Sequence, residues 1–167
     1  MAAMGEGHSD FAAWYRTAHP KVVTSLLLVT GDLHAAQEAA DEAFARAYDR
    51  WKRVSEMNSP TGWTYRVAFN VLRRKWHRAA LERTLLLRRT PPTTIPAPAG
   101  ETWEAVRQLP VRQRSAVVLR FVADLTEAEV AAAMGVSRST VSSSLIAAKR
   151  TLGRMIAEDP ALEADDA

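Results

Sequence analysis

The chain contains the stretch Thr126-Glu-Ala-Glu-Val-Ala-Ala-Ala-Met-Gly-Val-Ser-Arg-Ser-Thr-Val141, which decides the fold of its C-terminal half. Thr126 and Glu129 have the spacing of a capping box, the reciprocal side-chain cap that starts a helix. Gly135 suits the residue that ends this helix, and Ser137 suits the cap of the next one. We therefore predict two helices joined by a tight turn, which is a helix-turn-helix.

The second helix of this motif has an apolar side formed by Val141, Leu145, Ala148 and Leu152. Its polar residues gather near the N-terminal end, where a recognition helix meets base edges in the major groove. The candidate DNA contacts are therefore Ser137, Arg138, Ser139, Thr140, Ser142 and Ser143, with Lys149 and Arg150 able to reach phosphate. A plain helical hairpin is the alternative interpretation of this stretch.

The residues before the motif also predict helices. Trp103 to Gln108 is expected to form one helix, which ends at a turn at Leu109-Pro110. A second helix is expected to continue through the apolar residues Val117, Val118, Phe121 and Val122 and to stop at Ala123-Asp124-Leu125.

A proline-rich run, Thr90-Pro-Pro-Thr-Thr-Ile-Pro-Ala-Pro-Ala-Gly100, separates this half from the rest. At about 3.1 Å per residue such a linker could span roughly 30 Å. The predicted fold is all-α, with two small helical domains joined by this linker. The expected divisions are an N-terminal domain at 1–88, the linker at 89–100, the helix-turn-helix domain at 101–157 and an acidic, disordered tail at 158–167.

Two helices are expected in the first part of the N-terminal domain. The first runs from Asp10 to Thr30 and is expected to be interrupted near His19-Pro20, because proline disfavours helix at the residue before it. Asp32 is a plausible N-cap for the second, an amphipathic helix from Leu33 to Arg53. The outer face of the second helix carries acidic residues near its N-terminal end and basic residues near its C-terminal end, in the order that the helix macrodipole favours. By itself this order indicates a solvated face.

The stretch from Trp63 to Arg78 predicts a helix that contacts nucleic acid, because it is rich in cations and aromatic residues and contains no acid. Helical spacing places Arg66, Asn70, Arg73 and His77 in one polar stripe, flanked by Arg74 and Arg78. Cations around one carboxamide suit a phosphate track that also meets a base. The opposite side is apolar, and Trp63 is expected in the core there with Val67, Ala68, Val71 and Leu72. A merely solvated helix face is the alternative.

Composition excludes several classes of function. The chain has no cysteine, and its four histidines are far apart, so we expect no metal, disulfide or cofactor. It has no glycine-rich phosphate loop and no nucleophile constellation, which argues against an enzyme. The N-terminus lacks a signal peptide and no apolar run could cross a membrane, so we expect a cytoplasmic protein without a membrane partner. Residues 66–89 hold eight Lys/Arg and one acid, which favours a polyanionic partner.

Both halves together resemble the extracytoplasmic-function (ECF) subfamily of the sigma-70 family of bacterial RNA polymerase sigma factors. The N-terminal half resembles their region 2 and the C-terminal half their region 4. The residues that carry the resemblance are Gly31-Asp32 through Trp51, Pro60 through Asn70, Leu109-Pro110-x-Arg112-x-Arg114 through Arg120, and Val130 through Val141. The resemblance covers about residues 10 to 156.

The resemblance implies a role for each predicted surface. The helix from Leu33 to Arg53 would dock on the clamp helices of the polymerase β′ subunit, and the β flap is a further implied partner. The polymerase-binding residues would be Glu38, Asp41, Glu42, Arg46 and Arg50. The minus-ten promoter element would be held by Asn58, Ser59, Arg66, Asn70, Arg73, Arg74, Lys75, His77 and Arg78. The helix-turn-helix would bind the minus-thirty-five element.

An anti-sigma factor is a further partner that the resemblance implies. The competing hypothesis is a stand-alone helix-turn-helix regulator whose N-terminal helices form a sensing or dimerisation module. Such a protein would bind duplex DNA without polymerase, whereas a sigma factor requires the core enzyme.

Overall fold

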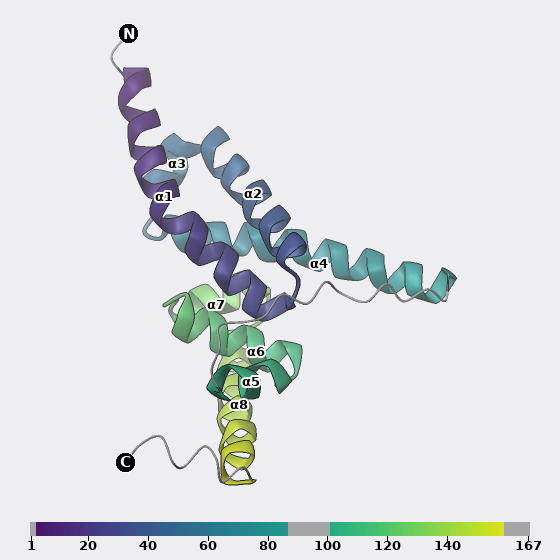
Figure 1. Cartoon of the computed structure of the whole chain (residues 1–167). Coiled ribbons are helices and arrows are strands. Elements are labelled where there is room, and N and C mark those ends of the chain that lie inside the picture. Colours follow the sequence, from purple (N-terminus) through teal and green to yellow (C-terminus); the bar gives the residue numbers. More distant parts are fainter. Residues whose placement is uncertain (1–2, 87–100, 159–167) are drawn as a thin grey trace.

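The structure, a computed structural model, describes residues 3–86 and 101–158, and every element in this part of the chain is helical (Figure 1). The linker predicted at 89–100 lies outside the described residues, as does the acidic tail after Glu158. The elements in chain order are α1 (Ala3–Thr30), α2 (Leu33–Asp49), α3 (Trp51–Ser55), α4 (Pro60–Leu86), α5 (Glu101–Gln108), α6 (Val111–Val117), the π-helix η1 (Val118–Val122), α7 (Glu127–Met134) and α8 (Arg138–Glu158). The fold is therefore all-α, as predicted.

Helices α1, α2 and α4 pack together to form the N-terminal module. The buried side of α2 is formed mostly by alanines, which let its neighbours approach closely, together with Phe44. The predicted cap is confirmed, because the Asp32 carboxylate accepts a hydrogen bond of 3.1 Å from the Ala35 backbone N–H. Buried positions recur at helical spacing along α2, so this part of the predicted amphipathic pattern is confirmed.

Two predicted helix boundaries in this module are wrong. Helix α1 is continuous through Pro20, whose neighbours Ala18 and Val22 are both buried in the same core. Packing of both halves on one core overrides the local cost of the proline. The predicted helix from Leu33 to Arg53 instead divides at Arg50, where φ is −121° and the chain turns into α3.

The helix-turn-helix is formed by α7 and α8. The capping box of Thr126 and Glu129 is present in both directions. Gly135 ends α7 with a left-handed φ of 66°, which glycine adopts without strain. The Ser137 hydroxyl accepts a hydrogen bond of 3.1 Å from the Thr140 N–H and so caps α8. The sequence predicted all three features.

The helix before the motif continues through Val122, as predicted. Its last turn is the π-helix η1, in which the Ala123 N–H reaches back to the Val118 carbonyl. Val118 and Leu119 are buried, whereas Phe121 is 69% exposed and carries the Arg120 guanidinium over its ring. The predicted stop after Val122 is confirmed, and the exposure of Phe121 shows that the buried side of this helix does not include it.

Helix α4 is buried on two sides, by α2 and by α7. Ala68, Val71 and Leu72 are buried as predicted, and Val67 is half-buried. The buried aromatic residues are Tyr65 and Phe69, whereas Trp63, expected in the core, is only half-buried. A second packing partner moves the buried side of a helix away from the position that periodicity alone predicts.

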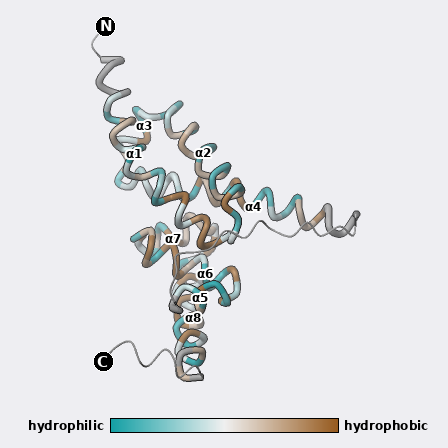
Figure 2. The backbone as a smooth tube through the Cα atoms, viewed as in Figure 1, coloured by the Kyte–Doolittle hydropathy of each residue, from teal (hydrophilic) through white to brown (hydrophobic). Residues whose placement is uncertain are grey.

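One hydrophobic cluster includes buried side chains from both modules, from Ala18 in α1 to Ala148 in α8. Figure 2 shows the hydrophobic C-terminal half of α1 reaching α6 in the middle of the molecule, and α1 also contacts η1. Part of α4 projects from this body (Figure 1). No helix in the described ranges is long and apolar enough to cross a membrane.

Candidate nucleic-acid interface

The predicted face of α8 is accessible at its N-terminal end. Ser137, Arg138, Ser139 and Ser143 are exposed, and Thr140 and Ser142 are half-exposed. Hydrogen bonds of 2.8 Å join the Ser137 hydroxyl to those of Ser139 and Thr140. These bonds form a small network of hydroxyls at the start of α8. Further along the helix, Lys149 and Arg150 are also exposed, so the predicted face combines hydroxyl groups with three cations.

The predicted polar stripe on α4 is divided into an open part and a covered part. Arg66, Arg74, His77 and Arg78 are exposed. Asn70 and Arg73, in the middle of the stripe, are half-buried, and the Arg73 guanidinium donates to the Asn70 side-chain oxygen. The same guanidinium donates a hydrogen bond of 3.2 Å to the Met134 carbonyl at the end of α7. The stripe therefore exists as predicted, but α7 occupies its centre.

The loop before α4 contains the predicted DNA contacts Asn58 and Ser59. Asn58 is exposed, whereas Ser59 is half-buried. The Ser59 hydroxyl accepts a hydrogen bond of 3.0 Å from the Gly62 N–H and thereby caps α4. Ser59 also hydrogen-bonds the Glu129 carboxylate of α7. Partial burial alone would raise the pKa of Glu129, but the hydrogen bonds from Ser59 and Thr126 lower it below its ordinary value.

The outer face of α2 carries the predicted polymerase-binding residues in a line. Glu42 and Arg46 form an ion pair with 2.6 Å between Oε1 and a guanidinium nitrogen. The Asp41 carboxylate lies 2.8 Å from Nε2 of His19 on α1. Arg50, at the break after α2, is exposed. The Glu42–Arg46 ion pair and the His19–Asp41 contact thus hold much of this face in a defined arrangement.

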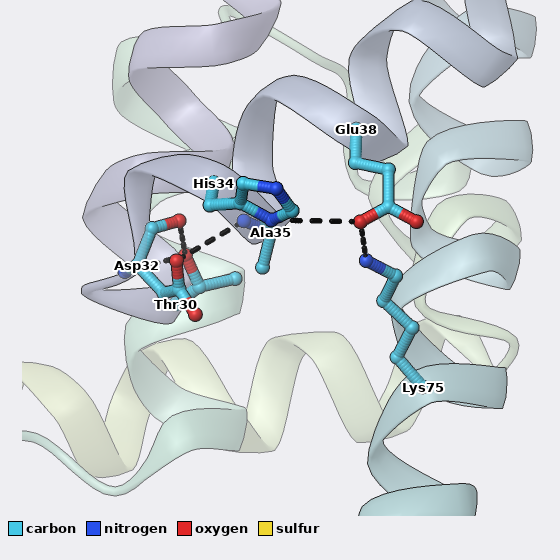
Figure 3. A network of polar contacts seen from close by, with 6 residues as sticks. All are labelled: Thr30, Asp32, His34, Ala35, Glu38 and Lys75. Carbon is cyan, nitrogen blue, oxygen red and sulfur yellow. Dashed lines mark hydrogen bonds and ion pairs between the residues drawn. The ribbon is translucent and has the colours of Figure 1, made fainter. Parts of the chain in front are cut away.

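Glu38 connects this face to α4. Figure 3 shows the Lys75 ammonium donating to the Glu38 carboxylate, with Nδ1 of His34 on its other side at 3.6 Å. The hydrogen bond from Lys75 is the largest cause of a pKa of Glu38 below its ordinary value of 4.5. Lys75 was predicted as a DNA contact and Glu38 as a polymerase contact, so this ion pair joins two predicted surfaces.

The same two surfaces line one groove between α2 and α4, with a volume of about 550 Å³. Its acidic wall is formed by Glu38, Asp41 and Glu42 of α2. Arg74, Lys75 and Arg78 of α4 form the basic wall. The structure therefore brings together side chains from the predicted polymerase set and the predicted minus-ten set.

Arg114 is an important residue that the predicted sites do not include. It is half-buried, its Nε donates to the Val29 carbonyl of α1 at 3.0 Å, and a second nitrogen donates to the Arg107 carbonyl at 2.6 Å. Burial and the nearby Arg107 charge lower the pKa of Arg114. In the sequence it belongs to the Leu109-Pro110-x-Arg112-x-Arg114 stretch that carries the family resemblance, and this pattern does not reveal the partner on α1.

Comparison with known proteins gives matches for both modules. Residues 14–82 match the family model described as Sigma-70 region 2, and residues 99–152 match the one described as Sigma-70, region 4. The RNA polymerase sigma-E factor of Streptomyces coelicolor is 30% identical over 161 residues, which cover 93% of this chain and 89% of that protein. The protein of the same name from Streptomyces avermitilis is 28% identical over 152 residues, covering 87% and 83%.

A solved structure is also similar across both modules. The sigma factor RpoE of Bartonella quintana, crystallised with the anti-sigma factor NepR, aligns with a TM-score of 0.76. The alignment covers 90% of this chain and 98% of that chain at 15% sequence identity. At this identity the similarity concerns the fold alone.

Proposed function

Because this chain belongs to the ECF subfamily of the sigma-70 family of RNA polymerase sigma factors, we propose that its predicted surfaces divide promoter recognition between them. The chain is a sigma factor, which binds core RNA polymerase and directs promoter recognition, DNA melting and transcription initiation. The observation that carries this function is the presence of both sigma regions, in family order, on one chain. The comparisons do not favour a stand-alone helix-turn-helix regulator.

Helix α4 and the loop before it bind the minus-ten element. Arg66, Arg74 and Arg78 are exposed cations that suit the phosphates of a separated strand, and such contacts give salt-dependent affinity. Asn70 offers a carboxamide to a base edge, and Asn58 stands exposed in the preceding loop. Stacking of an unpaired base on an aromatic side chain adds about 1–3 kcal/mol per base.

Helix α8 binds the minus-thirty-five element in the major groove. Its N-terminal hydroxyl groups and Arg138 are placed as base-reading side chains of a recognition helix usually are. Lys149 and Arg150 lie further along the helix and suit phosphate contacts. The recognition face holds few cations, so we expect base contacts from hydroxyl groups to contribute much of its specificity.

The outer face of α2 binds the β′ clamp helices of the polymerase. Its support is the line of charged residues from Glu38 to Arg50, most of them exposed although several are ion-paired within the chain. A partner helix with complementary charges can exchange the exposed Glu42–Arg46 pair for its own contacts at little cost, because exposed pairs are worth about 0–1 kcal/mol. The β flap is the proposed partner of the helix-turn-helix module.

Sigma factors are non-enzymatic initiation factors, and we propose that this chain has no catalytic activity and acts in the cytoplasm with the polymerase. The sigma factor RpoE, whose solved structure has a similar fold, is bound there by an anti-sigma factor. We propose a partner of that kind for this chain.

The test of the function is a pull-down with core RNA polymerase followed by run-off transcription from a genomic promoter library. A sigma factor co-purifies with the core enzyme and produces discrete transcripts only in its presence. Tight, sequence-specific binding to duplex DNA without polymerase would instead support the stand-alone regulator.

A further inference from the structure

The predicted DNA face of α8 includes an exposed apolar side chain. Ile146 is 53% exposed, although isoleucine is among the residue types that are most often buried. Elsewhere on this part of the helix, Val141 and Ala148 are buried and Leu145 is half-buried, because they face the core. Single exposed apolar residues are common on protein surfaces, so the meaning of Ile146 depends on where it lies along the helix.

Ile146 lies between two parts of the face that have different proposed partners. The spacing i, i+4, i+7 and i+11 places on one side of the helix Ser139, Ser143, Ile146 and Arg150. At 1.5 Å of rise per residue, Ile146 lies about 12 Å along the axis from Arg138 and about 6 Å from Arg150. The start of a recognition helix meets base edges, and cations further along it meet phosphates. Ile146 is therefore placed to enter the same groove between these two kinds of contact.

The hydroxyl group one turn before Ile146 has already used its hydrogen. The Ser143 hydroxyl donates to the Ser139 carbonyl at 2.6 Å. A serine hydroxyl has one hydrogen to donate, so in this arrangement Ser143 offers only lone pairs to DNA. In the major groove, thymine presents an acceptor oxygen and a C5 methyl group but no donor. Ser143 therefore cannot bind thymine in this arrangement, whereas the apolar side chain beside it can pack on the methyl group.

We propose that Ile146 is a specificity-determining residue of the recognition helix, and that it packs on the C5 methyl group of a thymine in the minus-thirty-five element. The inference rests on the proposed function, because it takes α8 as the helix that enters the major groove. It adds an apolar contact to a face whose predicted contacts are all polar or charged. Apolar side chains are suited to thymine, because its methyl group distinguishes it from the other bases in this groove.

The contact has a definite chemical requirement. Packing of Ile146 on the methyl group removes apolar surface of both partners from water. Loss of the methyl group alone should therefore weaken binding about fourfold. This ratio should not change with salt, whereas the phosphate contacts proposed for Lys149 and Arg150 weaken as salt is added. The methyl contact can thus be measured separately from the electrostatic part of the affinity.

The experiment first identifies the element that the chain binds. The full chain is combined with core polymerase, and duplex promoters are selected from a library in which the minus-thirty-five element is random. Each thymine of the selected element, on either strand, is then replaced in turn by deoxyuridine, which lacks only the C5 methyl group. Fluorescence anisotropy with the holoenzyme measures the affinity for each duplex.

At one thymine, the replacement should weaken binding of the wild-type holoenzyme about fourfold. Ile146→Ala should bind the thymine and uracil duplexes equally, because its side chain no longer reaches the methyl group. Ile146→Val keeps a branched apolar side chain and should still prefer thymine. The affinities of wild type and Ile146→Ala for the two duplexes form a double-mutant cycle, so a general loss of folding or of polymerase binding cancels.

Val111→Ala is the matched control. Val111 is a branched apolar residue of α6 with a similar exposure of 49%, and it lies outside the proposed DNA faces. This variant should show the same thymine preference as wild type. A selected element that contains no methyl-sensitive thymine overturns the proposal, and so does a methyl preference that Ile146→Ala retains.

Failure of this inference is distinguishable from failure of the proposed function. Run-off transcription from selected promoters that contain no methyl-sensitive thymine would indicate a sigma factor in which Ile146 does not contact a base. A chain that neither binds core polymerase nor selects any promoter refutes the proposed function, and the inference with it.

Discussion

Nε2 of His19 on α1 lies 2.8 Å from the carboxylate of Asp41 on the outer face of α2. The imidazole is largely covered, with 20% of its side chain exposed, whereas Asp41 is 65% exposed. Tyr15 and Phe44 stack around the same ring, so its position is well defined. His19 therefore fixes the orientation of a carboxylate that we propose to face the polymerase.

His19→Ala should weaken binding to core polymerase by a few-fold, because Asp41 loses the hydrogen bond that orients it, worth about 1 kcal/mol. Surface plasmon resonance with immobilised core enzyme measures this effect. His34→Ala is the comparison, since His34 is 88% exposed beside Glu38 and such a pair contributes little. Equal losses for both variants would show that Asp41 does not need His19.

The double change Asn70→Ala and Arg73→Ala should abolish open-complex formation and leave binding to core polymerase intact. Both side chains lie in the proposed minus-ten stripe, and each base or phosphate contact is worth about 1–3 kcal/mol. Permanganate footprinting of the melted strand reports open complexes. Lys52→Ala with Arg53→Ala removes exposed cations of α3, outside the proposed sites, and should melt promoters normally. Melting by the Asn70/Arg73 variant would show that the DNA face is wrongly assigned.

Arg138→Ala should weaken or relax recognition of the minus-thirty-five element, at a cost of about 1–3 kcal/mol. The effect should be at the lower end, because Arg138 is flanked by hydroxyl groups rather than by further cations. Competition transcription from promoters with altered minus-thirty-five sequences measures it. Arg154, exposed further along α8, provides the control variant Arg154→Ala. An unchanged sequence preference in Arg138→Ala would exclude Arg138 as a reader of bases.

Acid should destabilise the fold partly through Glu38. Its pKa is lowered in the folded state from 4.5, mainly by the hydrogen bond from Lys75, so the stabilisation is complete above pH 4.5 and is lost as the pH falls through the lower folded value. Urea unfolding at pH 7 and at about pH 3.5 should show a smaller acid loss for Lys75→Met than for wild type. The difference should stay below about 1 kcal/mol, because the pair is partly exposed.

Arg78→Met is the control for this measurement, since Arg78 lines the same groove. Its acid loss should equal that of wild type. If Arg78→Met and Lys75→Met behave alike, the charge of the groove rather than the Glu38–Lys75 bond governs the acid response.

Local signals in the sequence predicted the helices, their caps and the turn at Gly135, because these features depend on residues within a few positions of one another. Predictions failed where distant packing decides the outcome. Proline at position 20 does not break α1, because both halves of that helix pack in one core. No local signal in the sequence identifies the π-helix near Phe121. The half-burial of Trp63 has no local signal either.

In the candidate site, too, features that depend on nearby residues were predicted, and features that depend on distant packing were not. Helical spacing correctly grouped Arg66, Asn70, Arg73 and His77 on one side of α4, since that grouping depends only on the period of the helix. It could not reveal that Ser59 and Arg73 are engaged by α7, because these partners are separated by more than sixty residues of sequence. The hydrogen bond from Arg114 to Val29 was hidden for the same reason.

Lys75 is part of the basic wall of the groove, and its one ammonium group also pairs with the Glu38 carboxylate of the acidic wall. If a DNA phosphate takes this group, the Glu38 carboxylate loses its partner and becomes more attractive to a basic surface on the polymerase. If the polymerase takes Glu38 first, Lys75 is released toward the promoter. Equilibrium linkage requires the two effects to be equal in size. One lysine would thus make promoter and polymerase bind cooperatively, each favouring the arrival of the other.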